Sequence, residues 1–390
     1  MSIRQDRRSA DWLHGNARNI TFILTEDCQL RCKYCYLTGK NATRKMSYET
    51  AVKAVDRILN MPELVFDNAG VVWDFIGGEP LLETELMDKV CDYIKIRLFE
   101  TDHPWFNSYR FSLSSNGLLY GSPRVQEFIR KNRDHLSIGI SLDGNRAKHD
   151  SQRIFPNGKG SYDEVLKNVK LWLQQFPDAS TKATIAHDDL PYIKESVLHL
   201  WSVGIRNVNM NTIFEDCWQE GDDALFEEQL RALADEIIAG RYYEQYFCSL
   251  FDRHLSEPAL QDGNDSNWCG AGKMIAVGCD GSFYPCIRFA DFSLSNRQGW
   301  KTGDCDSGID ANRLRAFETL GRAIQSPSEC LVCDDRNGCA WCQGANYDFA
   351  GSDTIFQRIT YICKMHKARV RANKYFWNKL DKTLANNGNR

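Results

Sequence analysis

Residues 28–35 read Cys28-Gln29-Leu30-Arg31-Cys32-Lys33-Tyr34-Cys35 and come just after an apolar, strand-like run at Ile20–Leu24. Three and two residues separate the cysteines, so their thiols can bind three irons of a four-iron cubane and leave the fourth iron without a protein ligand. Closed structural zinc sites need four protein ligands, so three cysteines alone make a poor zinc site. An open coordination position suits chemistry on a bound molecule.

The bulk composition excludes several classes of protein. The chain has 390 residues, enough for a sizeable core and two domains. Its 48 basic and 52 acidic residues leave no electrostatic footprint for nucleic acid, and no apolar run is long enough for a membrane span. Residues 1–19 are polar and charged, with no signal-peptide core. The fifteen cysteines therefore favour metal or cluster ligation in a reducing cytoplasm over a disulfide framework.

Strand-like and helix-like stretches alternate from about residue 18 to residue 240, as in βα units around a parallel sheet. Six units predict an α/β fold with a partial, TIM-like (β/α)6 barrel. Reacting groups of βα barrels lie on loops after the strands, where the three cysteines fall. The expected strands are Ile20–Leu24, Val71–Phe75, Tyr109–Leu113, Leu136–Ile140, Lys182–Ile185 and Asn207–Met210. The expected helices are Tyr48–Leu59, Glu83–Leu98, Arg124–Asn132, Tyr162–Gln175, Pro191–Val203 and Ala224–Ala239.

The character of the sequence changes beyond residue 246. Residues 268–365 hold most of the cysteines and many small polar residues, with little periodicity, so bound clusters would have to cross-link this stretch. The chain is accordingly divided into a barrel (1–240), a bridging segment (241–267), a cysteine-rich domain (268–365) and a C-terminal helix (366–390). The basic residues around that helix are interpreted as a solvated helix face.

A second motif, Gly77-Gly78-Glu79-Pro80, comes directly after the second expected strand. Adjacent glycines let the backbone approach a ligand closely, although an ordinary strand-to-helix turn also explains them. Ser114 and Asn116 follow the third strand and either line the same mouth or belong to a plain turn. Glu215 and Asp216 lie beyond the sixth strand; they are solvated loop carboxylates by default and the candidate catalytic bases.

A third segment begins with Ser141 at the end of the fourth expected strand and continues to Arg153. A hydroxyl and a guanidinium suit the carboxylate of a bound amino acid, which arginine can hold with two hydrogen bonds. His149, between them, is interpreted as structural. Ser161 is expected to cap the following helix, with Glu164 completing a capping box.

The fourth motif is an array of cysteines in the C-terminal region. It comprises Cys269, Cys286, Cys330, Cys333, Cys339, Cys342 and Cys363. Its two CxxC pairs are also compatible with a zinc module, but five residues between the pairs is a short gap for a zinc ribbon.

The first motif, with Tyr34 before its last cysteine, resembles the CxxxCxΦC signature of radical S-adenosylmethionine (SAM) enzymes. The later array resembles the SPASM domain, although its last spacing is two residues where that family usually has three. Together the motifs are similar to radical SAM/SPASM maturases of ribosomally made peptides. Residues 268–273, 338–344 and 361–366 look similar to the branch paired with cysteine-repeat (CXXX) precursor peptides.

The resemblance implies SAM and three [4Fe–4S] clusters as cofactors. It assigns Cys28, Cys32 and Cys35 to the SAM-binding cluster, Cys269, Cys286 and Cys342 to a first auxiliary cluster, and Cys330, Cys333, Cys339 and Cys363 to a second. The first auxiliary set lacks a fourth cysteine; Cys248, Cys279, a substrate thiol or no ligand at all remain open. The implied SAM contacts are Tyr34, Gly77, Gly78, Glu79, Pro80, Ser114, Asn116, Ser141 and Arg153.

The activity implied is radical modification of a cysteine-containing precursor peptide by a sulfur-to-carbon thioether cross-link. A formylglycine-forming sulfatase maturase and a carbon–carbon cross-linking maturase are the alternatives. In sulfatase maturases an aspartate that acts as the catalytic base directly follows the cysteine matched by Cys286, whereas this chain has Ile287 and Arg288 there. The expected partners are the peptide and a low-potential electron donor. The 27 residues before Cys28 are too few for a fused leader-binding domain, so leader binding is expected to fall to another surface or to a separate protein.

Overall fold

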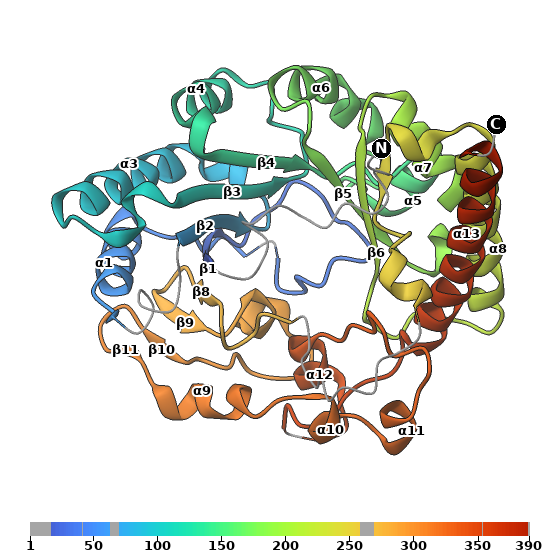
Figure 1. Cartoon of the computed structure of the whole chain (residues 1–390). Helices are drawn as coiled ribbons and strands as arrows, with labels where there is room; N and C mark the ends of the chain where they lie inside the picture. The colour runs from blue at the N-terminus through green and yellow to red at the C-terminus, as the bar shows by residue number, and fades with distance from the viewer. Residues whose placement is uncertain (1–16, 41, 63–69, 258–268, 353, 389–390) are drawn as a thin grey trace.

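The computed structural model describes residues 17–40, 42–62, 70–257, 269–352 and 354–388. Strands line a partial barrel and helices pack around its outside (Figure 1). The parallel strands β1 (Ala17–Thr25), β2 (Gly70–Gly77), β3 (Tyr109–Ser115) and β4 (Leu136–Ile140) are neighbours in one sheet. A second parallel sheet contains β5 (Ser180–Ile185), β6 (Asn207–Thr212) and β7 (Phe247–Cys248). The six expected strands are present, and the α/β partial barrel is confirmed.

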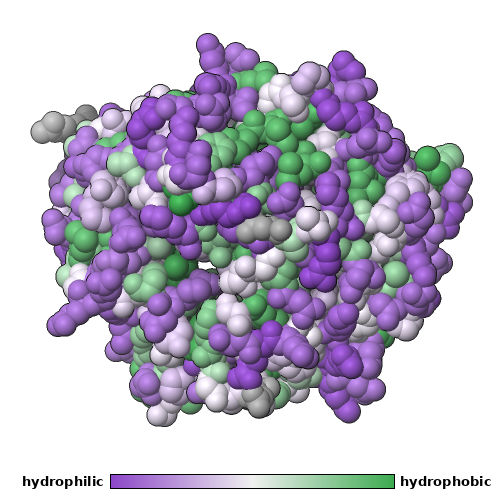
Figure 2. All heavy atoms as spheres, turned by 180° about the vertical axis from the view of Figure 1, so that it is seen from behind, coloured by the Kyte–Doolittle hydropathy of each residue, from purple (hydrophilic) through white to green (hydrophobic). Residues whose placement is uncertain are grey.

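The outer face of the barrel is apolar because alternate strand residues point toward the helices. Phe22 packs against Trp73 and Phe75, with ring centroids 6.0 and 6.1 Å apart, and Phe75 continues to Phe111. The helices of the barrel region are α1 (Tyr48–Leu59), α3 (Thr84–Glu100), α4 (Pro123–Asn132), α5 (Arg146–Gln152), α6 (Tyr162–Gln175), α7 (Ile193–Ser202) and α8 (Asp222–Ala239). With their apolar faces turned inward, polar side chains cover most of the surface seen in Figure 2, interrupted by apolar patches.

The inner face of the barrel is polar. Asp74 on β2 lies opposite Ser112 on β3, which lies opposite Ser137 on β4, and Lys182 on β5 lies opposite Asn209 on β6. Lys182 and Asn209 are exposed although they sit in the middle of strands, so solvent reaches the interior. Closed βα barrels fill this space with bulky branched side chains.

The cysteine-rich region extends the barrel's own sheet. Its strand β8 (Ile275–Val277) pairs in parallel with β1, and β9 (Ser282–Tyr284), β10 (Gly303–Asp304) and β11 (Gly308–Ile309) continue the sheet in antiparallel order. The region also contains α9 (Ala311–Glu318), α10 (Arg322–Gln325), α11 (Ser328–Leu331) and α12 (Gln343–Phe349). The sequence did not predict these strands.

The last helix, α13 (Cys363–Gly388), runs back along α8 at the side of the barrel (Figure 1). Its basic residues form the expected solvated face only in part, because Lys367 and Arg371 are exposed while several of the basic residues bond to neighbouring segments. Arg369 donates to Leu250 O at 3.0 Å, and Arg371 pairs with Glu227. No helix among the described residues is both long and apolar enough to cross a membrane.

Candidate functional site

The three cysteines of the first motif lie on the loop that leaves the C-terminal end of β1. Backbone hydrogen bonds fix this loop, including one from Arg31 N to Ile154 O at 2.7 Å. Burial raises the pKa of the Cys28 thiol to about 11 and is the first cause of the raised pKa of Cys32. A metal displaces the proton of such a thiol on binding, so the donor chemistry fits an iron cluster.

The described residues contain no group of three or more His, Cys, Asp or Glu side chains that could hold one metal ion. The cysteines of a four-iron cluster bind separate irons, and the expectation for this loop concerns such a cluster.

The Gly-Gly-Glu-Pro motif lies at the end of β2 and packs against the cysteine loop. A Cβ on Gly78 would lie 2.1 Å from Asp27 O and 3.0 Å from Cys28 Cβ, so only glycine fits. The buried Glu79 carboxylate accepts hydrogen bonds from Asn116 N at 2.7 Å and Ser115 Oγ at 2.8 Å. Burial is the first cause of its raised pKa. The motif therefore joins the loops that follow β1, β2 and β3.

One cavity of about 290 Å³ collects most of the residues singled out in the sequence. It is lined by the three loop cysteines and by every expected SAM contact: Tyr34, Gly77, Gly78, Glu79, Pro80, Ser114, Asn116, Ser141 and Arg153. Glu215 also lines this cavity. Asp216 is exposed and is not among the lining residues.

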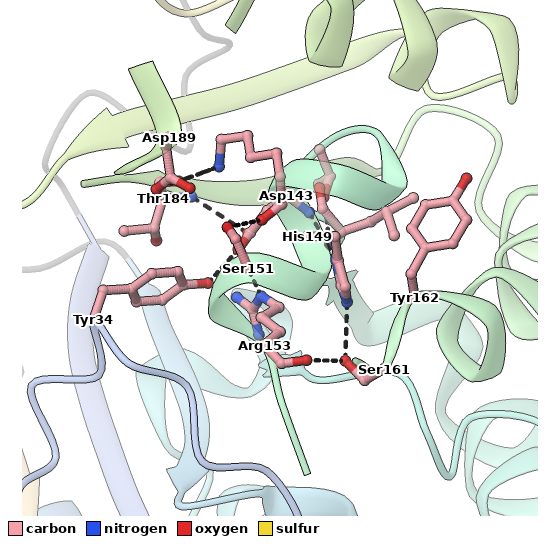
Figure 3. Close-up of polar contacts among 12 residues, drawn as sticks. Tyr34, Asp143, His149, Ser151, Arg153, Ser161, Tyr162, Thr184 and Asp189 are labelled. Carbon is pink, nitrogen blue, oxygen red and sulfur yellow. Dashed lines mark hydrogen bonds and ion pairs between the residues drawn. The ribbon is translucent and has the colours of Figure 1, made fainter. Parts of the chain in front are cut away.

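Asp143 connects the first motif to Arg153 (Figure 3). Arg153 donates from Nε to Asp143 Oδ2 at 3.0 Å, and the Tyr34 hydroxyl donates to the same oxygen. The Arg153 guanidinium also lies 5.5 Å from the centre of the Tyr34 ring. Complete burial acts to raise the pKa of Asp143, but the charges of Arg153 and Lys148 outweigh it and hold that pKa below its usual value. The carboxylate is therefore a fixed anion that orients both neighbours.

His149 supports the same segment from behind. Asp143 N donates to His149 Nδ1 at 3.3 Å, so a neutral His149 carries its proton on Nε2. That nitrogen then donates to Ser161 Oγ at 3.0 Å, and Ser161 Oγ donates to Arg153 O at 2.8 Å (Figure 3). Burial lowers the pKa of His149 to about 3, so the ring is neutral near pH 7. The structural interpretation of His149 agrees with these bonds.

The predicted capping role of Ser161 is wrong. Ser161 occupies the N-cap position of α6, but its side chain makes no capping hydrogen bond because it bonds to Arg153 O. Asp150 Oδ1 accepts from Tyr162 N at 2.8 Å instead, which satisfies an amide of the first turn.

The cysteines of the C-terminal region fall into two groups. Burial raises the pKa of Cys286, and the neighbouring Cys342 and Cys269 raise it further. Burial likewise raises the pKa of Cys363, and the neighbouring Cys339, Cys330 and Cys333 raise it further. The thiols that influence each other's pKa are members of the same sets that the sequence resemblance assigned to two auxiliary clusters.

The two cysteines considered as a fourth ligand of the first auxiliary set point elsewhere. The Cys279 thiol donates to Ile23 O at 3.2 Å. Cys248 is fully buried in β7, within the main core.

An ion pair lies between the loop cysteines and the first auxiliary set. Arg288 Nη1 donates to Glu215 Oε1 at 2.7 Å, and its guanidinium lies 4.3 Å from the centre of the Tyr36 ring. The pKa of Tyr36 is raised first by burial and then by Cys35 and the auxiliary cysteines Cys286 and Cys342. Tyr36 therefore stands between the two groups of thiols.

Sequence reasoning missed several residues of the cavity lining, namely Tyr36, Lys182, Thr184, Asn211 and Arg288. Lys182, Thr184 and Asn211 alternate along β5 and β6, and this period of two was the available signal. Asp143 lay inside a quoted segment, but its role depends on which side chains meet it.

Residues 22–189 match the family described as the Radical SAM superfamily. This region of the chain is therefore similar to radical SAM enzymes, a family whose chemistry implies SAM and a [4Fe–4S] cluster. Over a longer stretch, the chain is similar in sequence to the anaerobic sulfatase-maturating enzymes and to AlbA.

Among curated proteins, the serine-type anaerobic sulfatase-maturating enzyme of Bacteroides thetaiotaomicron is 23% identical over 79% of this chain and 77% of its own. The antilisterial bacteriocin subtilosin biosynthesis protein AlbA of Bacillus subtilis is 26% identical over 71% of this chain. The chain spans 56% of AlbA and 63% of an uncharacterized relative, MJ0907 of Methanocaldococcus jannaschii. The structure of native anSMEcpe with bound AdoMet and Cp18Cys peptide has the same fold, with a TM-score of 0.69 and 20% identity over 95% of this chain and 99% of that one.

Proposed function

We propose that this enzyme modifies a cysteine-containing ribosomal precursor peptide by joining a cysteine sulfur to a peptide carbon. One observation carries the proposal: a single cavity extends from the Cys28, Cys32 and Cys35 loop to Arg288 and Glu215, beside a group of three auxiliary cysteines. A molecule in this cavity can contact both regions. AlbA acts in bacteriocin biosynthesis, and anSMEcpe was solved with a bound peptide, which supports a peptide substrate.

In this proposal each group of residues has one task. The three loop cysteines hold the SAM-binding cluster, which with bound SAM supplies a 5′-deoxyadenosyl radical. Arg153 and Ser141 hold the SAM carboxylate, and Asp143 keeps Arg153 in position. The other expected contacts (Tyr34, Gly77, Gly78, Glu79, Pro80, Ser114 and Asn116) enclose the rest of SAM.

Cys269, Cys286 and Cys342 are proposed to hold an auxiliary [4Fe–4S] cluster with one iron left for the substrate thiolate. Cys330, Cys333, Cys339 and Cys363 hold a second. Arg288 is placed to attract the thiolate, because it lies in the cavity lining and is influenced by the charge of Cys342. Formation of a thioether removes one hydrogen atom from carbon and one proton from sulfur. It also releases one electron, which passes to an acceptor.

Two acids after β6 are the candidate catalytic bases of the proposal. Glu215 lines the cavity, but its pairing with Arg288 favours a positioning role, and Asp216 is exposed outside the lining. The division at residues 240, 267 and 365, a separate leader-binding protein and a low-potential electron donor are further parts of the proposal.

Formylglycine formation is the second candidate function. It is favoured by a cysteine-type anaerobic sulfatase-maturating enzyme of Clostridium novyi, 27% identical over 87% of this chain. Against it stand Ile287 and Arg288 after Cys286, where the sulfatase maturases have an aspartate base. A carbon–carbon cross-link is the third possibility and is distinguished by the same product analysis.

The test begins with anaerobic reconstitution of the full chain and an iron count. We expect about twelve irons per chain for three [4Fe–4S] clusters and release of 5′-deoxyadenosine with SAM and dithionite. The enzyme is then given a synthetic peptide of cysteine-repeat sequence. Mass spectrometry after reduction of any disulfides should find a loss of two hydrogens for each free thiol that disappears, with the sulfur retained.

Three results separate the alternatives. A loss of sulfur with an aldehyde that hydrazides trap would establish formylglycine formation. A loss of two hydrogens with an unchanged number of free thiols would establish carbon–carbon linkage. The variant Cys269→Ala should lose about four irons, whereas Cys279→Ala should lose none. Equal iron loss in both variants would contradict the proposed three-cysteine set.

A further inference from the structure

A second cavity, of about 740 Å³, lies inside the barrel beneath the candidate site. We call it the lumen cavity; its polar lining includes Arg110, Ser112, Ser137, Lys182, Asn209 and Asn211. It also reaches residues 175–179, which lead into β5, so it extends toward the end of the barrel away from the cysteine loop. The sequence analysis did not predict this space.

The lumen cavity and the site cavity meet. Ser114, Lys182 and Asn211 line both of them. All three side chains are exposed, although they belong to the interior of strands or their ends. A chain bound at the candidate site can therefore continue into the barrel without opening the fold.

Lys182 stands at this junction and is the cation best placed to bind a ligand there. Within the part of the chain that the structure describes, no ion pair includes Lys182, and its charge acts to lower the pKa of the nearby Asp74. Arg110, the other cation of the lining, donates to Leu136 O at 3.0 Å and is held at the strand edge. A ligand with a negative charge is complementary to this arrangement.

The remaining lining suits a peptide. Asn209 and Asn211 each offer an amide donor and a carbonyl acceptor, and the serines offer hydroxyls. These groups match the alternating N–H and C=O of an extended backbone without selecting side chains.

We propose that the lumen cavity binds a carboxylate-bearing segment of the substrate peptide, with Lys182 pairing with the carboxylate. The inference rests on the proposed peptide substrate and adds that this peptide carries a negatively charged carboxylate. The carboxylate belongs either to an acidic side chain or to the C-terminus of the peptide.

The test measures calorimetric binding of three synthetic peptides to the reconstituted, SAM-bound full chain. They are acetyl-Gly-Cys-Gly-Gly-Asp-amide, the same peptide with Asn-amide at its end, and the Asn peptide with a free C-terminal carboxylate. We expect at least one carboxylate peptide to bind about tenfold more tightly than the neutral Asn-amide, as a charge-assisted hydrogen bond implies. The peptide that binds more tightly than the neutral one shows whether the carboxylate comes from an acidic side chain or from the C-terminus.

Variants assign the preference to Lys182. Lys182→Met should abolish it and Lys182→Arg should keep it, whereas Lys170→Met, at an exposed lysine on the outside of α6, should leave it unchanged. Equal binding of all three peptides, no binding of any, or an unchanged preference in Lys182→Met would overturn the inference.

The two proposals fail in different ways. If the wild-type enzyme releases 5′-deoxyadenosine but binds all three peptides equally, only the proposed carboxylate site in the lumen cavity is contradicted. If the wild-type enzyme distinguishes the peptides but releases no 5′-deoxyadenosine, the proposed function is contradicted and the carboxylate site is kept.

Discussion

At the scale of single residues, Asp143 decides the geometry of the candidate SAM site. Its carboxylate holds Arg153 by Nε, which leaves the two terminal nitrogens of the guanidinium to face a ligand. The same carboxylate accepts from Tyr34 of the cysteine motif. One buried charge therefore aligns the cluster loop with the residue proposed to bind the SAM carboxylate.

We predict that Asp143→Asn weakens SAM binding at least tenfold and lowers the free energy of unfolding by about 3 kcal/mol, because the Arg153 charge loses its buried partner. Equilibrium dialysis with SAM and chemical unfolding measure the two effects. Asp163→Asn is the matched control, since Asp163 pairs with Arg146 on the surface, where both side chains are exposed. SAM binding by Asp143→Asn as tight as by the wild type would contradict the positioning role.

Asp74 gives a pH-dependent prediction. Burial raises its pKa from 3.8 to about 6, so the folded chain holds this proton more tightly than the unfolded chain. The stability that the protonated group contributes is full below about pH 4 and is lost as the pH rises through 6.

Asp74→Asn removes that loss. The variant should therefore unfold with a free energy up to about 3 kcal/mol higher than the wild type at pH 8 and with a nearly equal one at pH 4. Urea unfolding at both pH values makes the comparison. A difference of the same size at the two pH values would exclude titration of Asp74 as its cause.

Residues that carry a motif could be recognised from the sequence because spacing alone marks them. The loop cysteines, Ser141 and Arg153 line one cavity, as their positions after strands suggested. Asp143, by contrast, is defined by its partners on distant segments. Asp150 rather than Ser161 caps α6 because Ser161 is used by Arg153 O, a contact that no local pattern reports.

At the scale of elements, the turn after β2 is as restricted as the cysteine loop that it supports. Gly78 N donates to Thr25 O at 2.9 Å, which places the turn directly against the end of β1. An added Cβ would meet Asp27 O at 2.1 Å, a backbone atom that moves only with the loop.

Gly78→Ala should therefore displace Cys28 and reduce the iron content by about four irons per chain, with loss of SAM cleavage. Gly351→Ala is the control, because nothing lies within 4 Å of the position of its added Cβ. Iron analysis after reconstitution and the yield of 5′-deoxyadenosine are the measurements. Full iron content in Gly78→Ala would show that the two loops do not depend on each other.

The six main strands were predictable because each is a run of five or more residues next to an amphipathic helix. The strands β8–β11 have two or three residues each, too short for any period. Their position depends on β8 reaching the free edge of β1 from more than two hundred residues away along the chain. Local sequence carries no information on that pairing.

At the scale of the whole molecule, α13 connects the cysteine-rich region to the barrel. It begins at Cys363, one of the proposed ligands of the second auxiliary cluster, and then packs along α8. The completely buried Asn373 accepts from Asp252 N at 2.7 Å and donates to Leu250 O at 2.9 Å. Phe376 packs on Phe251 of the same turn, with ring centroids 4.5 Å apart.

Asn373→Leu should lower the free energy of unfolding by about 2–3 kcal/mol, because it leaves the Asp252 amide buried without its partner. A loosened α13 also releases Cys363, so the variant should lose iron faster than the wild type when a chelator is added. Asn378→Leu, at an exposed position of the same helix, should change neither quantity appreciably. Lower stability with unchanged iron loss would mean that the helix supports the barrel but not the second cluster. Unchanged stability would mean that the hydrogen bonds of Asn373 to the backbone of residues 250 and 252 do not hold the helix in place.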